Sequence, residues 1–267
     1  MSERVKLEFR DGVADVRMCR ADKMNAIDSA MFSALGDAGR ALAADKSVRA
    51  VVLSGEGRAF CAGLDMESFA AMAGPRSGGN ADPKLFERST SGANRAQLAA
   101  WIWQELPVPV IAAVHGVAYG GGLQIALGAD IRIVAPDTRL SVMEVKWGLV
   151  PDMSGTQTLR RLVRQDVAKE LTFTGRVISG EEAVSLGLAT RTSAKPREDA
   201  LALAAEIAGK SPDAVRAAKK LLQEAWQGTV AEGLQLEEAL QRSLIGKPNQ
   251  LEAVKANFEK RAPKFAD

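Results

Sequence analysis

The chain has 267 residues and a formal net charge of +2, from 35 basic and 33 acidic side chains that are mixed along the sequence. This balance argues against nucleic acid as a partner, and no apolar run is long enough to predict a membrane span. Two cysteines are too few for a disulfide framework, and the first residues lack the apolar run of a signal peptide. We therefore expect a cytoplasmic protein with one α/β domain and a helical appendage.

The first half of the chain predicts buried strands that alternate with helices. Residues 13–18 alternate in polarity and residues 50–54 form a short apolar run, so each is predicted to be a strand. Asp28 is predicted to cap a helix that runs to about Ala43. Residues 70–84 contain Gly-Pro, Gly-Gly and Asp-Pro pairs, which predict a mobile loop. A helix is expected to follow, over about 85–105.

The second half predicts two further strands and then mostly helices. Residues 110–114 and 131–135 are apolar and read as buried strands, and the glycine run 120–122 opens a short helix between them. From about residue 156 helical patterns dominate, with Ser179 and Ser211 as predicted N-caps. Strand–helix units followed by helices indicate an α/β fold, with a core over 1–195 and a helical region over 196–267.

Two glycine-containing segments follow predicted strands. In residues 58–65 the small Ala62 and Gly63 let the backbone approach a ligand and donate an N–H group. In residues 114–124 three glycines open a helix, whose free N–H groups suit an anion or a developing oxyanion. Their spacing is not that of the dinucleotide fingerprint. Each segment alone also fits an ordinary turn, whereas together they supply the two donors of an oxyanion hole.

The order of these motifs resembles the crotonase (enoyl-CoA hydratase/isomerase) superfamily. The residues that carry the resemblance are 24–27, 61–65, 120–122, 148–151, 155–157 and 208–220. The resemblance implies a crotonase-like spiral of ββα units and C-terminal helices that build homotrimers or dimers of trimers. It also implies an acyl-CoA thioester as substrate, whose carbonyl is held by the N–H groups of Ala62 and Gly121. Coenzyme A is then part of the substrate, and no separate cofactor is expected.

The resemblance further implies which residues surround the thioester. The expected substrate-binding residues are Arg58, Ala59, Phe60, Gly63, Asp65, Gln124 and Trp147. Among these, the backbone of residues 58–60 is expected near the adenine end of coenzyme A. No metal site is expected, because one histidine and two distant cysteines do not form a ligand set.

Three side chains bear on the reaction. Hydratases of the superfamily use two glutamates, and this chain has Gln124 at the first position, where an amide cannot act as general acid or base. Glu144 stands at the second position. Asp152 follows eight residues later, a spacing that resembles dienoyl-CoA isomerases, although those also usually carry an aspartate where Gln124 stands. An apolar pocket that raises one carboxyl pKa would separate the acid from the base.

We therefore expect an acyl-CoA isomerase with Glu144 as the base and Asp152 as the partner acid. Two alternatives stay open: an enoyl-CoA hydratase in which Gln124 only orients water, and a non-catalytic acyl-CoA binder. Asp152 also fits the N-cap of a helix that begins near Ser154. Gln124 also fits a purely structural hydrogen-bonding role.

Other conspicuous side chains are interpreted more simply. His115, the only histidine, and Cys61 are predicted to be packed residues without a catalytic role. Tyr119 fits either the acyl pocket or the core. Residues 258–261 resemble the final helix of the family, whose cations can meet coenzyme A phosphates, and they also fit a solvated helix end.

Overall fold

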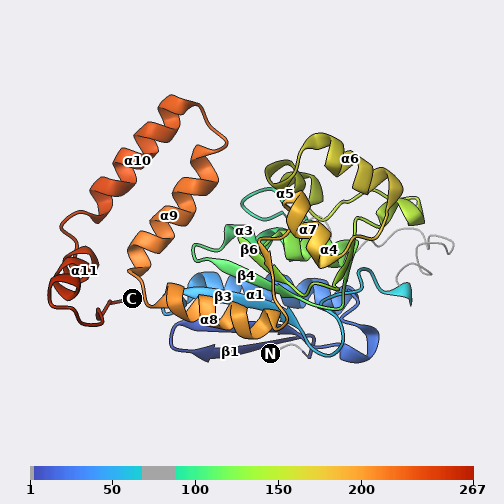
Figure 1. Ribbon diagram of the computed structural model, residues 1–267, viewed down its shortest axis with the longest axis horizontal. Helices are drawn as coiled ribbons and strands as arrows, with labels where there is room; N and C mark the ends of the chain where they lie inside the picture. The colour runs from blue at the N-terminus through green and yellow to red at the C-terminus, as the bar shows by residue number, and fades with distance from the viewer. Residues whose placement is uncertain (1–2, 68–87) are drawn as a thin grey trace.

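A six-stranded sheet forms the centre of the computed structural model, which describes residues 3–67 and 88–267 (Figure 1). In spatial order its strands are β1 (Val5–Arg10), β2 (Val13–Met18), β3 (Ala50–Gly55), β4 (Val110–Val114), β6 (Ile131–Val134) and β8 (Arg191–Thr192). β1 and β2 form an antiparallel hairpin, and the other neighbours in this sheet pair in parallel. A second, two-stranded parallel sheet joins β5 (Val117–Tyr119) to β7 (Arg139–Ser141). The predicted α/β class is confirmed.

Helices cover the sheet and continue beyond it. In chain order they are α1 (Ser29–Ala44), α3 (Arg95–Glu105), α4 (Gly121–Leu127), α5 (Gly155–Leu162), α6 (Gln165–Thr174), α7 (Gly180–Leu186), α8 (Pro196–Ala208), α9 (Pro212–Ala225), α10 (Val230–Leu244) and α11 (Pro248–Phe258), with 3-10 turns η1 (Ala21–Lys23) and η3 (Glu144–Trp147). None of the helices within the described ranges has the length and apolarity that crossing a bilayer requires.

Alternate side chains of the parallel strands pack into two separate cores. On β3, Val51 and Leu53 face the larger core, which α1 and α3 complete, whereas Val52 faces the smaller one. α8 closes the smaller core with buried alanines spaced four residues apart, at 200, 204 and 208. Small side chains at this spacing put one smooth helix face against the sheet. Both faces of the parallel strands are therefore covered, as such sheets require.

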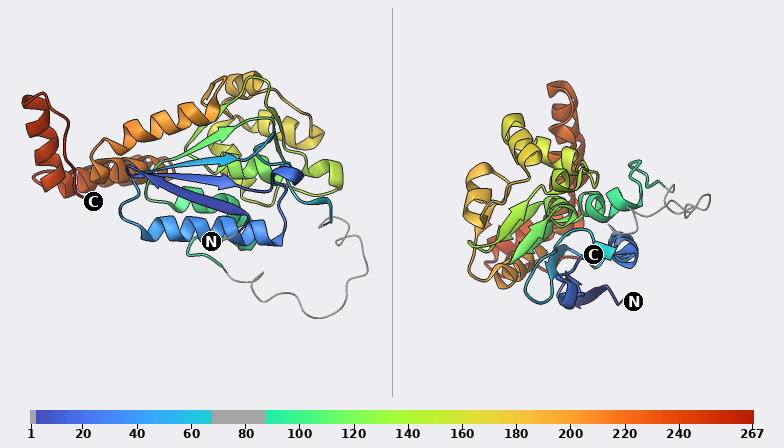
Figure 2. Two further views of the ribbon diagram at one scale, coloured as in Figure 1. Left: turned by 90° about the horizontal axis from the view of Figure 1, so that it is seen from below. Right: turned by 90° about the vertical axis from the view of Figure 1, so that its right-hand side faces the viewer.

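The C-terminal helical region has two parts. α8, which begins at the predicted boundary near residue 196, lies against the sheet and belongs to its core. α9 and α10 pack side by side and extend away from the sheet, with α11 beyond them (Figures 1 and 2). Only this second part projects beyond the sheet.

Most predicted elements are confirmed, with one clear error at the start of α3. The strands over 13–18, 50–54, 110–114 and 131–135, and the caps at Asp28, Ser179 and Ser211, are present. The predicted helix start near residue 85 is wrong, because the described residues 88–94 are not helical. Instead, Asn94 and Gln97 form a reciprocal capping box that starts the helix at Arg95. The predicted loop over 70–84 lies outside the described residues.

Candidate active site

A cavity of about 1010 Å³ brings the two glycine-containing segments together with η3. Its wall includes Leu64 from the first segment, Tyr119 and Gly121 from the second, and Trp147 from η3. The wall is mostly apolar, and the volume suits a bound organic ligand. The sequence segments that were singled out separately therefore share one site.

Backbone pairing joins the two segments. The Cys61 N–H donates to the Val117 carbonyl over 3.0 Å, and the Tyr119 N–H donates to the Cys61 carbonyl over 3.1 Å. Just beyond, Gly63 has a φ of +88°, and a Cβ there would lie 2.6 Å from the Tyr119 carbonyl oxygen. Only glycine permits both the backbone conformation and the close approach. The segments converge at the point where the oxyanion hole was expected.

One of the two predicted donors is wrong. The Ala62 N–H donates to the Met24 carbonyl over 2.9 Å and is therefore not available to a ligand. After the turn at Gly63, the Leu64 N–H makes no hydrogen bond to any described residue, and Leu64 lines the cavity. The Gly121 N–H, in the first turn of α4, is likewise free of partners among the described residues. The structure thus offers Leu64 and Gly121 as the pair of donors.

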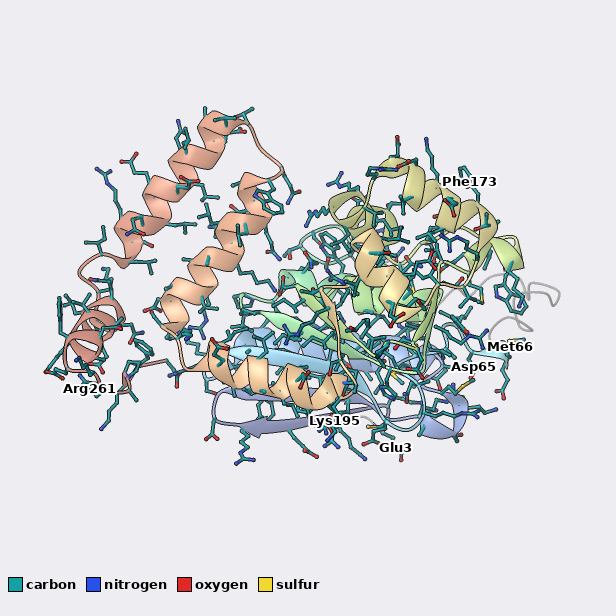
Figure 3. All side chains as sticks on the ribbon, viewed as in Figure 1. Glu3, Asp65, Met66, Phe173, Lys195 and Arg261 are labelled. Carbon is teal, nitrogen blue, oxygen red and sulfur yellow. The ribbon has the colours of Figure 1, made fainter. Side chains whose placement is uncertain are left out.

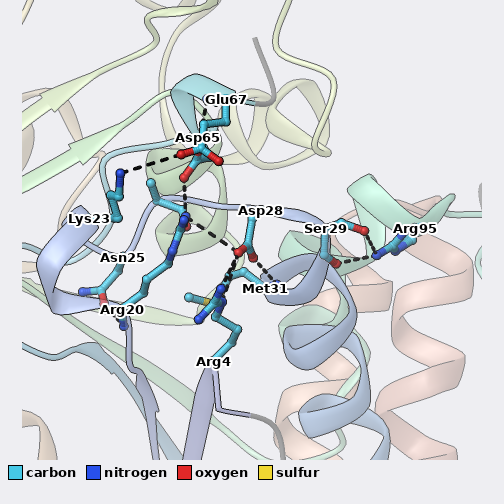
Figure 4. Close-up of polar contacts among 11 residues, drawn as sticks. Arg4, Arg20, Lys23, Asn25, Asp28, Ser29, Met31, Asp65, Glu67 and Arg95 are labelled. Carbon is cyan, nitrogen blue, oxygen red and sulfur yellow. Dashed lines mark hydrogen bonds and ion pairs between the residues drawn. The ribbon is translucent and has the colours of Figure 1, made fainter. Parts of the chain in front are cut away.

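An ion network anchors the chain directly after the first donor (Figure 4). Asp65 is 4% exposed, accepts the Glu67 N–H over 2.8 Å and pairs with the Arg20 guanidinium. Arg20 also lies 3.8 Å from Asp28, which pairs with Arg4 over 2.8 Å. The Glu67 N–H and then Arg20 lower the pKa of Asp65 against the effect of burial. Arg20 was not identified from sequence, because its partner is 45 residues away.

Glu144 is the buried carboxylate of the cavity. It begins η3, lines the cavity and is 9% exposed. Its Oε1 accepts the Gln124 Nε2–H over 2.6 Å, while its Oε2 is buried without a hydrogen-bond partner among the described residues. Burial raises the pKa of Glu144, and the nearby charge of Asp152 raises it further. A carboxyl with a raised pKa can exchange a proton near neutral pH.

Asp152 is the second carboxylate at this end of the cavity. It lines the cavity wall, and loss of surrounding water raises its pKa. Its alternative interpretation as a helix cap is wrong, because Ser154 occupies the N-cap position of α5 without a side-chain cap bond. Asp152 is therefore an exposed residue at the cavity wall and not the cap of α5.

Gln124 lies behind the cavity wall. It is 2% exposed and is not among the residues that line the cavity. Its Oε1 accepts the N–H groups of Met153 over 2.9 Å and Gly155 over 2.8 Å, and its Nε2 donates to Glu144. The expected contact between Gln124 and the substrate is therefore corrected: this amide contacts Glu144 instead.

The remaining predicted substrate-binding residues divide into two groups. Gly63, Asp65 and Trp147 line the cavity. Ala59 and Phe60 are fully buried and do not line it, and Arg58 is exposed outside it. Their expected position near the adenine end of coenzyme A stays a prediction.

Cys61 agrees with its interpretation as a packed residue, whereas His115 is only half-buried and hydrogen-bonded. Cys61 is fully buried, and burial raises the pKa of its thiol to about 12, so the reactive thiolate is not populated. His115 Nε2 lies 2.9 Å from the Gly57 carbonyl oxygen. Tyr119 lines the cavity. Within the described ranges, no three His, Cys, Asp or Glu side chains gather as a metal site would require.

The basic residues near the C-terminus lie far from this cavity. Figure 3 labels Asp65 and Met66 at the opposite end of the molecule from Arg261. Arg261 pairs with Glu252 and Glu259, each over 2.6 Å. Any contact between these cations and a ligand in a cavity would therefore have to involve a second copy of the chain.

Comparison with known proteins adds to this geometry. Residues 8–267 match the family model described as enoyl-CoA hydratase/isomerase. Mouse (Mus musculus) mitochondrial methylglutaconyl-CoA hydratase is 34% identical over 265 residues, covering 97% of this chain and 81% of the relative. Mouse mitochondrial enoyl-CoA hydratase domain-containing protein 2 is 35% identical over 261 residues, which cover 95% of this chain and 84% of the relative. The crystal structure of enoyl-CoA hydratase from Bacillus anthracis superposes with a TM-score of 0.86, at 30% identity and 98% coverage of both chains.

Proposed function

The chain belongs to the enoyl-CoA hydratase/isomerase family, and from that premise we propose that it is an acyl-CoA isomerase that shifts a double bond by proton transfer. The observation that carries the proposal is the pair Glu144 and Asp152 in one cavity, with the neutral Gln124 where a second glutamate would serve a hydratase. The substrate is an enoyl- or dienoyl-CoA thioester, and coenzyme A stays attached throughout as part of the substrate rather than acting as a separate cofactor.

The thioester carbonyl lies between the N–H groups of Leu64 and Gly121. Removal of a proton from the acyl chain moves electrons onto this oxygen and gives an enolate-like anion. Donors that are already oriented stabilise the anion without reorganisation, and one such donor contributes about 3–4 kcal/mol in a measured protease case. The mostly apolar wall strengthens this interaction because it excludes water.

Glu144 removes the proton and Asp152 returns one at the other end of the conjugated chain. The carbon–hydrogen bond that breaks at one carbon is replaced by one that forms at another, so the double bond moves and the atoms are conserved. Glu144 must begin ionised and Asp152 protonated. Burial raises the pKa of each carboxyl above its ordinary value, which favours the protonated form that the returning acid needs.

Hydration is the second candidate, and the names of the relatives favour it. Both mouse relatives carry the word hydratase in their names. In this version Glu144 alone activates water for addition to the β-carbon, and Gln124 takes no part in proton transfer.

The proposed assembly is a homotrimer or a dimer of trimers. Large apolar side chains on the projecting helices support it, among them Trp226 and Phe258, which are 80% and 85% exposed. Single exposed apolar residues are ordinary, whereas a run of them along three helices favours a protein interface.

A thioester panel tests the proposal. Crotonyl-CoA and a 3,5-dienoyl-CoA are offered to the wild type, Glu144→Gln and Asp152→Asn, and ultraviolet absorbance and product mass are followed. Isomerisation of the dienoyl thioester is expected, with a loss of roughly 10²-fold or more in each variant. A product heavier by one water would establish the hydratase instead, full activity of Asp152→Asn would remove Asp152 from the mechanism, and tight binding without turnover would leave a non-catalytic binder.

A further inference from the structure

We propose that Gln124 is a positioning residue whose single amide orients Glu144 and holds the backbone turn that carries Asp152. The inference rests on the proposed function, since it assigns a role in presenting the two carboxylates to a substrate. Gln124 is 2% exposed and lies behind the cavity wall, so it acts through its neighbours and not by touching the ligand.

The orientation of the amide is fixed by its surroundings. Two backbone N–H groups, from Met153 at 2.9 Å and Gly155 at 2.8 Å, point at one terminal atom of Gln124. Only an oxygen can accept both, so the other terminal atom must be the NH₂ group. That group lies 2.6 Å from Glu144 Oε1 and must donate to it. The reversed amide would place its NH₂ group against two N–H donors and its oxygen against the Glu144 carboxylate oxygen.

This orientation gives the two oxygens of Glu144 different roles. Oε1 is held as an acceptor and stays unprotonated, because a proton there would meet the Gln124 Nε2–H. Oε2 is buried and makes no hydrogen bond to the described residues. The catalytic proton is therefore carried by Oε2.

The same amide stabilises a strained turn next to the partner acid. Ser154, between the two N–H donors, has a φ of +67°, which an L-residue rarely adopts. Gln124 Oε1 bridges this turn, and a Cβ at position 155 would come within 2.6 Å of it, which explains the glycine there. Asp152 directly precedes the bridged residues. Its place at the cavity wall thus depends on Gln124.

A glutamate at this position would behave differently. The two N–H groups and the N-terminus of α5 would favour its ionised form, which would place a negative charge against Glu144. Around Glu144, Asp152 is the ionisable neighbour, and its charge raises the pKa of Glu144 when Asp152 is ionised. Gln124 from α4 is neutral, and Lys146 on η3 is exposed and lies over the Trp147 ring. The neutral amide of Gln124 therefore donates a hydrogen bond to Glu144 without adding a second negative charge beside it.

The test follows the titration of Glu144 itself. The full-length protein is labelled with carboxyl-¹³C glutamate, and the Glu144 signal is identified by its loss in Glu144→Gln. The variants are Gln124→Glu, which keeps the shape of the side chain, and Gln124→Met, which removes its polar atoms. The matched control is Gln104→Met. Gln104 is half-buried and donates to the Gly128 carbonyl over 2.7 Å, and it makes no hydrogen bond to Glu144.

In both Gln124 variants the pKa of Glu144 should rise by roughly one unit or more, the size of one lost hydrogen bond to a charged group. In Gln104→Met it should stay at the wild-type value. With a thioester that the wild type turns over, kcat of Gln124→Glu should fall by roughly tenfold or more while KM changes by less than about twofold, since no substrate contact is lost.

Two results would overturn the inference. One is a Glu144 titration that is the same in Gln124→Glu as in the wild type. The other is a raised KM with unchanged kcat, which would make Gln124 a substrate contact. If the wild type turns over no thioester, the proposed function fails, but the NMR titration still decides whether Gln124 controls Glu144.

Discussion

Glu144 occupies a position that favours its protonated form, and this has a cost for the folded state. Because burial raises its pKa above that of the unfolded chain, its contribution to stability is present below the ordinary glutamate pKa and is lost as pH rises through the folded value. Above the folded-state pKa of Glu144 the protein therefore carries a buried carboxylate at a cost in stability.

Glu144→Gln should accordingly be more stable than the wild type at about pH 7, because the neutral amide removes the buried charge and still accepts from Gln124. The advantage should shrink toward about pH 4, where the wild-type carboxyl is protonated. Thermal unfolding of both proteins across this range measures it. A variant that is less stable at every pH would show that Glu144 stabilises the fold.

Asp65 fixes the loop that carries the Leu64 N–H group through its ion pair with Arg20, so its charge matters for the direction of that donor. Asp65→Asn removes the ionised partner of Arg20 and should cost roughly 1–3 kcal/mol of unfolding free energy. We expect kcat to fall as the Leu64 N–H loses its fixed direction. The control is Asp37→Asn, whose exposed pair with Arg40 should be worth no more than about 0.5 kcal/mol. Equal losses in the two variants would contradict the anchoring role.

At the same scale, sequence located the site but not every contact. The glycine segments, Glu144 and Asp152 all lie at the cavity. Sequence placed the first donor at Ala62, however, and the turn at Gly63 moves the free N–H to Leu64. Hydrogen-bond partners of backbone groups depend on strands that meet from distant parts of the chain, and a linear motif does not specify them.

Among the elements, α9 is attached to the core by a buried cation. Lys219 is 7% exposed and donates to Asp130 over 2.8 Å and to the carbonyls of Trp103 and Val108 over 3.1 and 2.9 Å. All three ammonium hydrogens therefore have acceptors. Burial lowers the pKa of Lys219, and the ion pair with Asp130 opposes this.

Lys219→Met should destabilise the protein by about 3–5 kcal/mol, because it leaves Asp130 without its counter-ion and two carbonyls without a donor. The exposed neighbour provides the control: Lys220→Met should change the free energy of unfolding by less than about 0.5 kcal/mol. Chemical denaturation of both variants measures the difference. Equal stability of the two would mean that α9 is held by its apolar contacts alone.

Sequence predicted the bounds of a helix or strand where residues close to that boundary determine it. Short apolar runs predicted the strands β3 and β4, and capping residues predicted the helix starts at Asp28 and Ser211. Each of these signals lies within a few neighbouring residues of the chain. The edge strand β1 was not predicted, although residues 5–10 alternate strictly between apolar and polar side chains, the pattern typical of a half-buried strand. The start of α3 was misplaced because the capping box at Asn94 was overlooked.

At the scale of the whole molecule, α9 to α11 extend away from the sheet with their apolar side chains exposed (Figure 2). If this surface joins copies of the chain, Trp226→Glu should shift the protein to smaller species in light scattering coupled to size-exclusion chromatography. Phe9→Glu, at an exposed aromatic on β1, is the matched control and should leave the mass unchanged. A wild type that is monomeric would contradict the proposed trimer.

Proton exchange between solvent and an unsaturated thioester tests the central claim most directly. The wild type and Glu144→Gln are incubated in D₂O with the dienoyl-CoA, and deuterium in the recovered thioester is counted by mass spectrometry. We predict incorporation at the carbons flanking the shifted double bond with the wild type and a loss of roughly 10²-fold or more with Glu144→Gln. Equal incorporation by the two proteins would contradict the assignment of Glu144 as the base.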